Sequence, residues 1–197
     1  MSSQKLILGT AEFNPEGYAG YPALPKKDIK KILDCAKEGG INILDTAESY
    51  GCQETLKTLA KGFCIYTKTR DWKVSLDWGD NELRGILYHY KPEEKQVALP
   101  FVHRWVNLGV SVYDSEQLPR ETTRILQIPF NWENRRFQDC FRTFRTVFVR
   151  SVFSRGEMFK QGYSVGDCLW FVKQYRPDGV IVGVKSVKEL ETIIKNF

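Results

Sequence analysis

Four polar residues stand at or just beyond the ends of three short apolar runs in the first half of the chain. Asp45 closes the run Ile-Asn-Ile-Leu, and Tyr50 follows it five residues later. Lys68 closes the run Phe-Cys-Ile-Tyr-Thr, and His89 closes Gly-Ile-Leu-Tyr. If each run is a strand of one parallel sheet, the strand ends meet at the same edge of that sheet. The four side chains would then share one site.

These residue types together make a proton donor for a carbonyl oxygen. A tyrosine hydroxyl has a pKa of about 10, and a neighbouring Lys68 ammonium favours the phenolate and lowers the pKa of Tyr50. Asp45 pairs with the lysine and keeps it charged, and His89 orients the substrate oxygen or shares the proton. Each residue also has a structural interpretation: a packed tyrosine, a helix cap at Asp45, an exposed lysine and a buried histidine. Their coincidence at successive strand ends favours the site.

The rest of the chain supplies strands whose ends would meet in this way. Eight β-rich runs are predicted at 5–8, 41–44, 63–67, 85–88, 108–112, 125–128, 147–152 and 179–182. Helical periodicity is found at 29–36 (with Gly39-Gly40 as the C-cap), 54–60, 94–106, 134–144, 165–175 and 187–195. Alternating strands and helices imply parallel pairing, and eight such units imply a closed barrel.

We therefore expect the α/β class and a single domain over residues 1–197, a compact, trimmed (β/α)8 TIM barrel. A typical barrel of this kind has about 250 residues, so some helices must be shortened or missing. The weakest helix patterns lie at 71–82 and 115–123. A doubly wound open sheet is the alternative, but no G-x-G-x-x-G turn follows the first strand.

The composition excludes several classes of protein. Hydrophobic residues make up 42% of the chain and charged residues 27%, as in an ordinary globular domain, and the apolar runs are too short to span a bilayer. No secretory signal is evident, and the five scattered cysteines form no C-x-x-C pair, so neither a zinc site nor a disulfide framework is indicated. We expect no metal, no membrane association and a cytoplasmic location.

The net charge of +5 suits either a polyanion or an anionic small ligand. Six arginines cluster in the second half, at positions 135, 136, 142, 145, 150 and 155. On a helical wheel, Arg135 and Arg142 lie opposite the stripe of Phe137, Phe141 and Phe144. Most of the cluster is therefore predicted to be a solvated helix face, and no nucleic-acid partner is expected.

Several segments resemble the aldo-keto reductase family. Residues 40–51 read Gly-Ile-Asn-Ile-Leu-Asp-Thr-Ala-Glu-Ser-Tyr-Gly and are similar to the family signature G-x-x-x-x-D-T-A-x-x-Y-G. Residues 9–11, 108–113, 127–131, 149–153 and 183–186 resemble the first, fifth, sixth, seventh and eighth strand ends of the family. The likeness therefore runs in order along nearly the whole chain.

The resemblance implies a reductase that converts an aldehyde or ketone to an alcohol with NADP(H). Tyr50 would be the general acid, with Asp45 and Lys68 as its tuning residues and His89 as the group that orients the small carbonyl substrate.

The resemblance also implies a cofactor site. Ser111 and Gln127 match positions that hold the nicotinamide carboxamide, and Lys185 and Ser186 match the segment that binds the adenosine phosphate. Barrels often bind phosphate after the seventh and eighth strands, at a helix N-terminus, although Ser186 could equally be an ordinary helix cap. Arg150 and Ser151 are added as hypothetical contributors of charge near the pyrophosphate.

The chain also departs from the family pattern. The intervals from Tyr50 to Lys68 and from Lys68 to His89 are shorter than usual, and Val112 stands where many relatives place Asn. These departures leave a second interpretation open, a catalytically reduced barrel that acts as a nucleotide-binding or regulatory module. Barrel surface left bare by a missing helix would favour self-association into a homo-oligomer.

Overall fold

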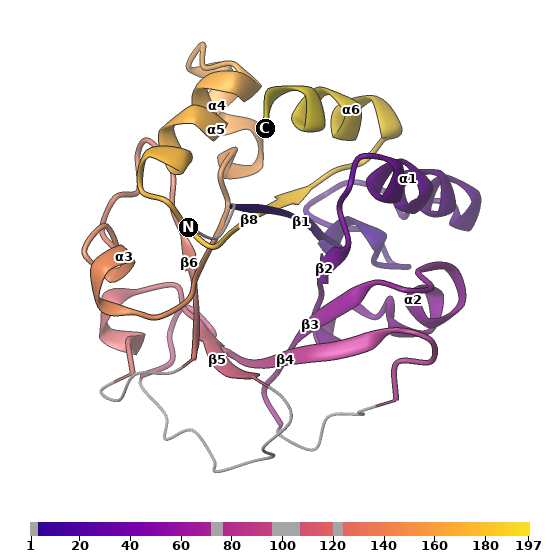
Figure 1. The fold of residues 1–197 in the computed structure, drawn as a ribbon, viewed down its shortest axis with the longest axis horizontal. Coiled ribbons are helices and arrows are strands. Elements are labelled where there is room, and N and C mark those ends of the chain that lie inside the picture. Colours follow the sequence, from indigo (N-terminus) through magenta and orange to yellow (C-terminus); the bar gives the residue numbers. More distant parts are fainter. Residues whose placement is uncertain (1–3, 72–76, 96–106, 120–123) are drawn as a thin grey trace.

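The strands of the computed structural model form a closed parallel barrel (Figure 1). The structure describes residues 4–71, 77–95, 107–119 and 124–197. The strands are β1 (Lys5–Gly9), β2 (Ile43–Asp45), β3 (Cys64–Thr69), β4 (Glu82–His89), β5 (Asn107–Ser111), β6 (Ile125–Pro129), β7 (Val147–Arg150) and β8 (Gly179–Gly183). Each strand pairs with its sequence neighbours, and β8 closes the ring on β1. The expected compact (β/α)8 barrel is confirmed.

The predicted strands are all present, with small differences at their ends. The second begins two residues later than expected and ends on Asp45 itself. The seventh stops at Arg150 because Ser151 has a φ of 58°, which turns the backbone out of the sheet. The fourth is longer than its apolar run and reaches His89.

The described helices lie on the outside of the barrel (Figure 1). The longer ones are α1 (Lys26–Glu38), α2 (Gln53–Leu59), α5 (Val165–Gln174) and α6 (Val187–Asn196). The shorter ones are α3 (Cys140–Thr143), α4 (Glu157–Lys160) and the 3-10 turns η1 (Ala11–Phe13), η2 (Glu48–Tyr50), η3 (Ser115–Gln117) and η4 (Ser154–Gly156). Between β5 and β6 the described chain forms only η3, as the weak helix pattern at 115–123 indicated. The predicted helix at 94–106 lies almost wholly outside the described residues.

The helix predicted at 134–144 is wrong in extent. Residues 134–135 have no regular structure, 136–139 form turns, and only Cys140–Thr143 are helical. Phe137 is buried and Phe141 packs on Phe130, so the aromatic stripe faces the core as expected. Most of the arginine cluster is solvated as expected, since all of its members except Arg150 are exposed, but with so short a helix they do not form one helix face. Arg135 stacks on Trp132 and Arg136 pairs with Asp114.

The apolar spacing explains the longer helices. In α1, Ile29, Ile32, Leu33 and Ala36 repeat at the helical period and are all buried. The helix ends at Gly39, and Gly40 has a φ of 79°, which lets the amide of Ile41 donate to the Ala36 carbonyl at 2.8 Å. This is the predicted glycine C-cap.

The part of the barrel interior that lies away from the carboxyl ends of the strands is apolar. One buried cluster joins six strands inside the ring: Ile7, Ile43, Leu87, Ile125, Phe148 and Ile181. The ring of Tyr66 meets that of Phe148 edge to face, 5.1 Å between centroids. Gly85 and Gly179 leave space for these two rings, since a Cβ at either glycine would collide with them. This plug leaves the carboxyl ends of the strands, here called the barrel mouth, for polar side chains.

No helix among the described residues is long and apolar enough to cross a membrane.

Candidate active site

The structure brings the four residues of the proton-donor set (Asp45, Tyr50, Lys68 and His89) together at the barrel mouth. Asp45 is the last residue of β2, Lys68 lies near the end of β3, and His89 ends β4. Tyr50 ends the 3-10 turn η2 that follows β2. The Tyr50 ring lies edge-on to the His89 ring, with 6.2 Å between the two centroids. The Lys68 ammonium lies 5.1 Å from the centroid of the Tyr50 ring.

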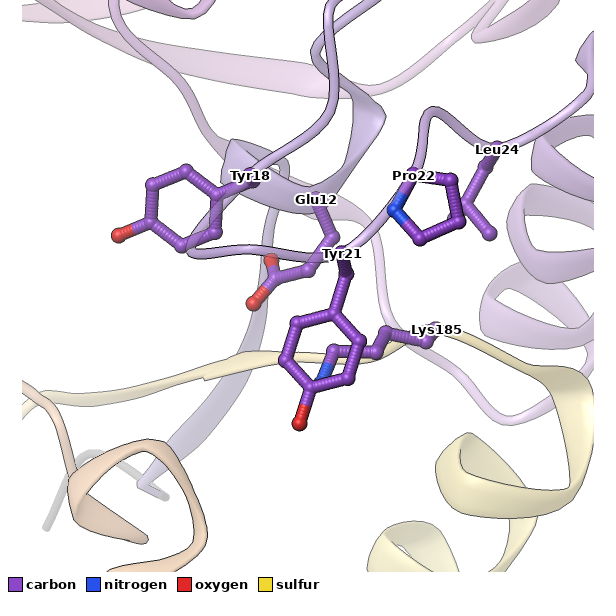
Figure 2. Close-up of a pocket in the computed structure, with 6 residues that line it drawn as sticks. All are labelled: Glu12, Tyr18, Tyr21, Pro22, Leu24 and Lys185. Atoms are coloured by element: carbon purple, nitrogen blue, oxygen red, sulfur yellow. The ribbon is translucent and has the colours of Figure 1, made fainter.

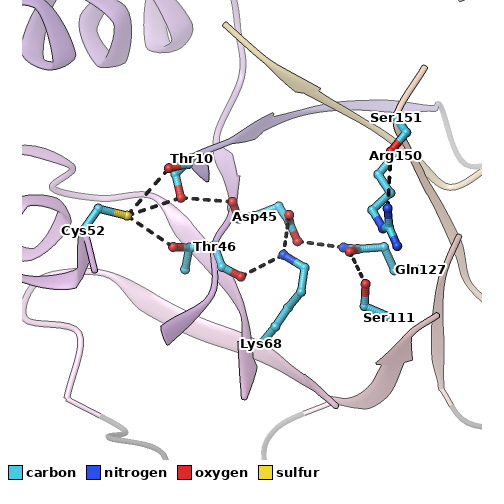
Figure 3. A network of polar contacts seen from close by, with 9 residues as sticks. All are labelled: Thr10, Asp45, Thr46, Cys52, Lys68, Ser111, Gln127, Arg150 and Ser151. Atoms are coloured by element: carbon cyan, nitrogen blue, oxygen red, sulfur yellow. Dashed lines mark hydrogen bonds and ion pairs between the residues drawn. The ribbon is translucent and has the colours of Figure 1, made fainter. Parts of the chain in front are cut away.

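Lys68 and Asp45 form a buried ion pair (Figure 3). Lys68 Nζ lies 2.6 Å from Asp45 Oδ2 and also donates to the Thr46 carbonyl at 2.9 Å. The side chains are 1% and 6% exposed. Burial lowers the pKa of Lys68, and the Asp45 charge opposes that shift. The alternatives of an exposed Lys68 and of Asp45 as a helix cap are wrong, since η2 has no side-chain cap.

The Tyr50 hydroxyl is a neutral phenol. Among the described residues no protein group hydrogen-bonds to it, so it can bind a substrate oxygen. Burial first, and then the Asp45 charge, raises the pKa of Tyr50 well above 10. The expected lowering by Lys68 is therefore wrong, because Asp45 neutralises the ammonium at close range and burial disfavours the phenolate.

His89 is also neutral. Burial, followed by the charges of Lys68, Arg150 and Arg70, lowers the pKa of His89 to about 3. A neutral imidazole carries one N–H donor and one acceptor nitrogen, so it can orient a carbonyl oxygen without adding charge.

Ser111 and Gln127 extend the ion pair across the barrel (Figure 3). The Ser111 hydroxyl lies 2.8 Å from Gln127 Oε1, to which it donates. Gln127 Nε2 donates to Asp45 Oδ1 at 2.7 Å. Both side chains are fully buried. Gln127 therefore fixes the Asp45 carboxylate, a role that the sequence did not reveal because 82 positions separate the two residues.

Arg150 reaches the same mouth from β7. Its guanidinium donates to the Val112 carbonyl at 2.8 Å and to the Ser151 hydroxyl at 3.3 Å. It also stacks on the Tyr113 ring, 4.4 Å from the centroid, and Tyr113 in turn stacks on His89 at 6.5 Å. Tyr113 was not singled out from the sequence, although it stands two residues beyond the predicted site residue Ser111.

Lys185 and Ser186 lie at a separate place, between β8 and α6. The Ser186 hydroxyl accepts from the Glu189 amide at 3.2 Å, so it is the N-cap of α6. The Glu189 carboxylate accepts from the Lys185 amide at 2.7 Å. The Lys185 ammonium lies over the Tyr21 ring, 3.0 Å from its centroid.

A pocket of about 180 Å³ opens beside Lys185 (Figure 2). It is lined by Glu12, Tyr18, Tyr21, Pro22, Leu24 and Lys185. Glu12 packs against Gly183, where a Cβ would collide with the carboxylate, and Glu12 Oε2 is buried without a hydrogen-bond partner among the described residues. Burial raises the pKa of Glu12, and Lys185 opposes that shift. Glu12 was not selected from the sequence, because no motif or pattern marks it.

The described residues contain no group of three or more His, Cys, Asp or Glu side chains placed to hold a metal ion. The five cysteines are free thiols.

Several solved structures that superpose on this chain are described as aldo-keto reductases. A proposed aldo-keto reductase of Pseudomonas aeruginosa superposes with a TM-score of 0.75 at 19% identity, over 97% of this chain and 88% of that one. The holo form of an aldo-keto reductase of Bacillus halodurans gives 0.67 at 14% identity, over 98% and 86%. An aldo-keto reductase of Bombyx mori in complex with NADP gives a TM-score of 0.65 at 16% identity, over 98% of this chain and 83% of that one.

The chain has the aldo-keto reductase fold. No family model matches the sequence, and no curated protein matches it either. The likeness therefore rests on the architecture alone.

Proposed function

We propose that the protein is an NADP(H)-dependent oxidoreductase that reduces an aldehyde or ketone to an alcohol, with Tyr50 as the general acid. The observation that carries the proposal is the position of the Tyr50 hydroxyl at the barrel mouth, beside the buried Lys68–Asp45 pair and without a hydrogen bond to any described residue. The fold and the names of two neighbours, one a holo form and one an NADP complex, support a nicotinamide cofactor.

Two places bear on the fit of such a cofactor. Ser111 and Gln127 lie at the barrel mouth, but both are fully buried and hydrogen-bonded to each other, so they would meet a carboxamide only after their side chains move. The pocket beside Lys185 offers a cation for a phosphate. Glu12 and Glu189 lie near that cation and reduce its attraction for a phosphate. A bound nicotinamide would supply the hydride that reduces the carbonyl carbon.

The chain's own side chains would manage the proton. Tyr50 donates its hydroxyl proton to the carbonyl oxygen as that oxygen gains negative charge. Asp45 and Gln127 hold Lys68 in place beside the Tyr50 ring. Neutral His89 contributes a hydrogen bond that orients the carbonyl.

The test is reduction of a panel of aldehydes and ketones, followed by loss of NADPH absorbance, with wild type and Tyr50→Phe. We expect Tyr50→Phe to lower kcat by roughly 10²- to 10⁴-fold while the NADPH dissociation constant changes less than about twofold. Tyr175→Phe, at the end of α5, is the matched control and should keep full activity. A rate that survives Tyr50→Phe would remove this residue as the acid.

The alternative, a nucleotide-binding or regulatory module, is not favoured, because the whole proton-donor set is retained. It predicts NADPH binding without turnover of any carbonyl in the same panel.

A further inference from the structure

Arg150 carries a formal charge at the barrel mouth that no described neighbour neutralises. The Asp45 and Lys68 charges cancel within their ion pair. Tyr50 is a neutral phenol and His89 a neutral imidazole at ordinary pH. Arg150 remains, a guanidinium that is always protonated.

The partners of Arg150 hold it in place without neutralising it. Within the described ranges no carboxylate lies within ion-pair distance of it. It donates to one carbonyl and one hydroxyl and stacks on Tyr113. These contacts use two of its five N–H groups and leave others available for a bidentate oxyanion. A partly buried, unpaired charge is costly, and an anionic ligand would offset that cost.

The guanidinium also lies on the reacting side of the mouth. It acts electrostatically on Tyr50, Lys68 and His89. The rings of Tyr50, His89 and Tyr113 form a continuous series of contacts from the proposed acid to the arginine. The turn that follows is strained: Ser151, Ser154 and Arg155 have φ values of 58°, 46° and 54°. Such strain commonly accompanies a functional site.

We propose that Arg150 binds a carboxylate of the substrate, so that the protein prefers carbonyl compounds that carry an acidic group. The inference rests on the proposed carbonyl reduction and names its substrate class. A phosphate oxygen of the cofactor offers similar oxyanion chemistry, as the sequence-based hypothesis held. The substrate is the better occupant because Arg150 contacts the aromatic wall beside Tyr50, whereas the pocket cation, Lys185, lies elsewhere.

The test compares an acid with its neutral counterpart. Reduction of succinic semialdehyde and of its methyl ester is measured with wild type, Arg150→Gln and Arg150→Lys. Arg136→Gln, which removes a surface arginine paired with Asp114, is the matched control. We expect wild type and Arg136→Gln to favour the acid in kcat/KM by about 10- to 100-fold. Arg150→Gln should lose the preference, mainly through KM, and Arg150→Lys should keep part of it.

A second arm separates the two sources of oxyanion. The NADPH dissociation constant of Arg150→Gln should stay within about threefold of wild type. An unchanged preference for the acid combined with NADPH binding weakened tenfold would overturn the proposal in favour of the cofactor phosphate. Equal use of acid and ester by wild type would also overturn it.

A third arm does not depend on turnover. Binding of 4-hydroxybutanoate and of 4-hydroxybutanamide to the protein is measured by calorimetry. If no carbonyl is reduced, the proposed function fails, but binding of the acid by wild type and not by Arg150→Gln still supports the carboxylate site. Equal binding of acid and amide, or equal binding by both proteins, counts against it.

Discussion

Gln127 on β6 donates a hydrogen bond to the Asp45 carboxylate on β2, at 2.7 Å across the interior of the barrel. Asp45 Oδ2 is bound by Lys68, so Oδ1 depends on this amide. The relationship ties the orientation of the buried ion pair to a strand on the opposite side of the ring.

Replacement of Gln127 by Met should therefore destabilise the fold. The variant keeps the side-chain volume but leaves Asp45 Oδ1 and the Ser111 hydroxyl without their partner, which costs about 1–3 kcal/mol. The free energy of unfolding in urea is the measurement. Gln174→Met, on the exposed side of α5, is the control and should change stability by less than about 0.5 kcal/mol. A similar loss in both variants would contradict the assigned role.

Breaking the ion pair from one side should cost more than removing it. Asp45→Asn leaves the Lys68 ammonium buried and uncompensated, and we expect a loss of about 3–5 kcal/mol. The double variant Asp45→Asn/Lys68→Met removes both charges and should recover most of that loss. Denaturant unfolding of the two variants and of Lys68→Met forms a double-mutant cycle. Additive losses would show that the two charges do not interact.

His89 should make the fold sensitive to acid. Its folded pKa is about 3, below the unfolded value of 6.5, so below pH 6.5 the unfolded state binds more protons. The destabilisation is absent above pH 6.5, grows as the pH falls, and approaches about 1.4 kcal/mol per pH unit until about pH 3. The measurement is the free energy of unfolding of wild type and His89→Gln from pH 7 to pH 4. The free energy of unfolding of wild type should fall relative to that of His89→Gln as the pH falls. A difference between the two that stays constant with pH would show that His89 titrates normally.

Glu12 should weaken the binding of a phosphate beside Lys185. Removing its charge in Glu12→Gln is expected to tighten NADPH binding by roughly three- to tenfold, because the lysine then faces one carboxylate fewer. Fluorescence titration with NADPH and NADH gives the dissociation constants. Glu16→Gln removes the same charge from an exposed position four residues away and should have little effect. Unchanged or weaker NADPH binding in Glu12→Gln would place the phosphate elsewhere.

The strand ends could be predicted because local pattern and chemistry coincide there. Asp45, Lys68 and His89 each close an apolar run, and the alternation of strands and helices requires these ends to meet. The direction of the Tyr50 pKa could not be predicted, since it depends on burial and on how completely Asp45 neutralises Lys68. The helix at 134–144 was overestimated because aromatic side chains at helical spacing also suit a tight series of turns.

Contacts between distant strands left no mark in the sequence. Arg150 was placed near the pyrophosphate only as a hypothesis, within an arginine cluster that suggested a solvated face, and its contacts with Tyr113 and Val112 are seen only in the folded ring. Glu12 is one acid among many until the close approach of Gly183 and the cation of Lys185 are known.

Closure of the eight strands into a ring allows the outer helices to be shortened without exposing an edge strand. In an open sheet, the edge strands expose unpaired backbone groups, and covering helices protect them from pairing with other chains. Here β8 pairs with β1 over five residues, so the ring has no edge. Shortening an outer helix then uncovers side chains but no edge strand, and surface substitutions alone can compensate. The barrel thus offers a starting point for designing barrels of minimal length, in which the outer layer is shortened and the carboxyl ends of the strands are kept.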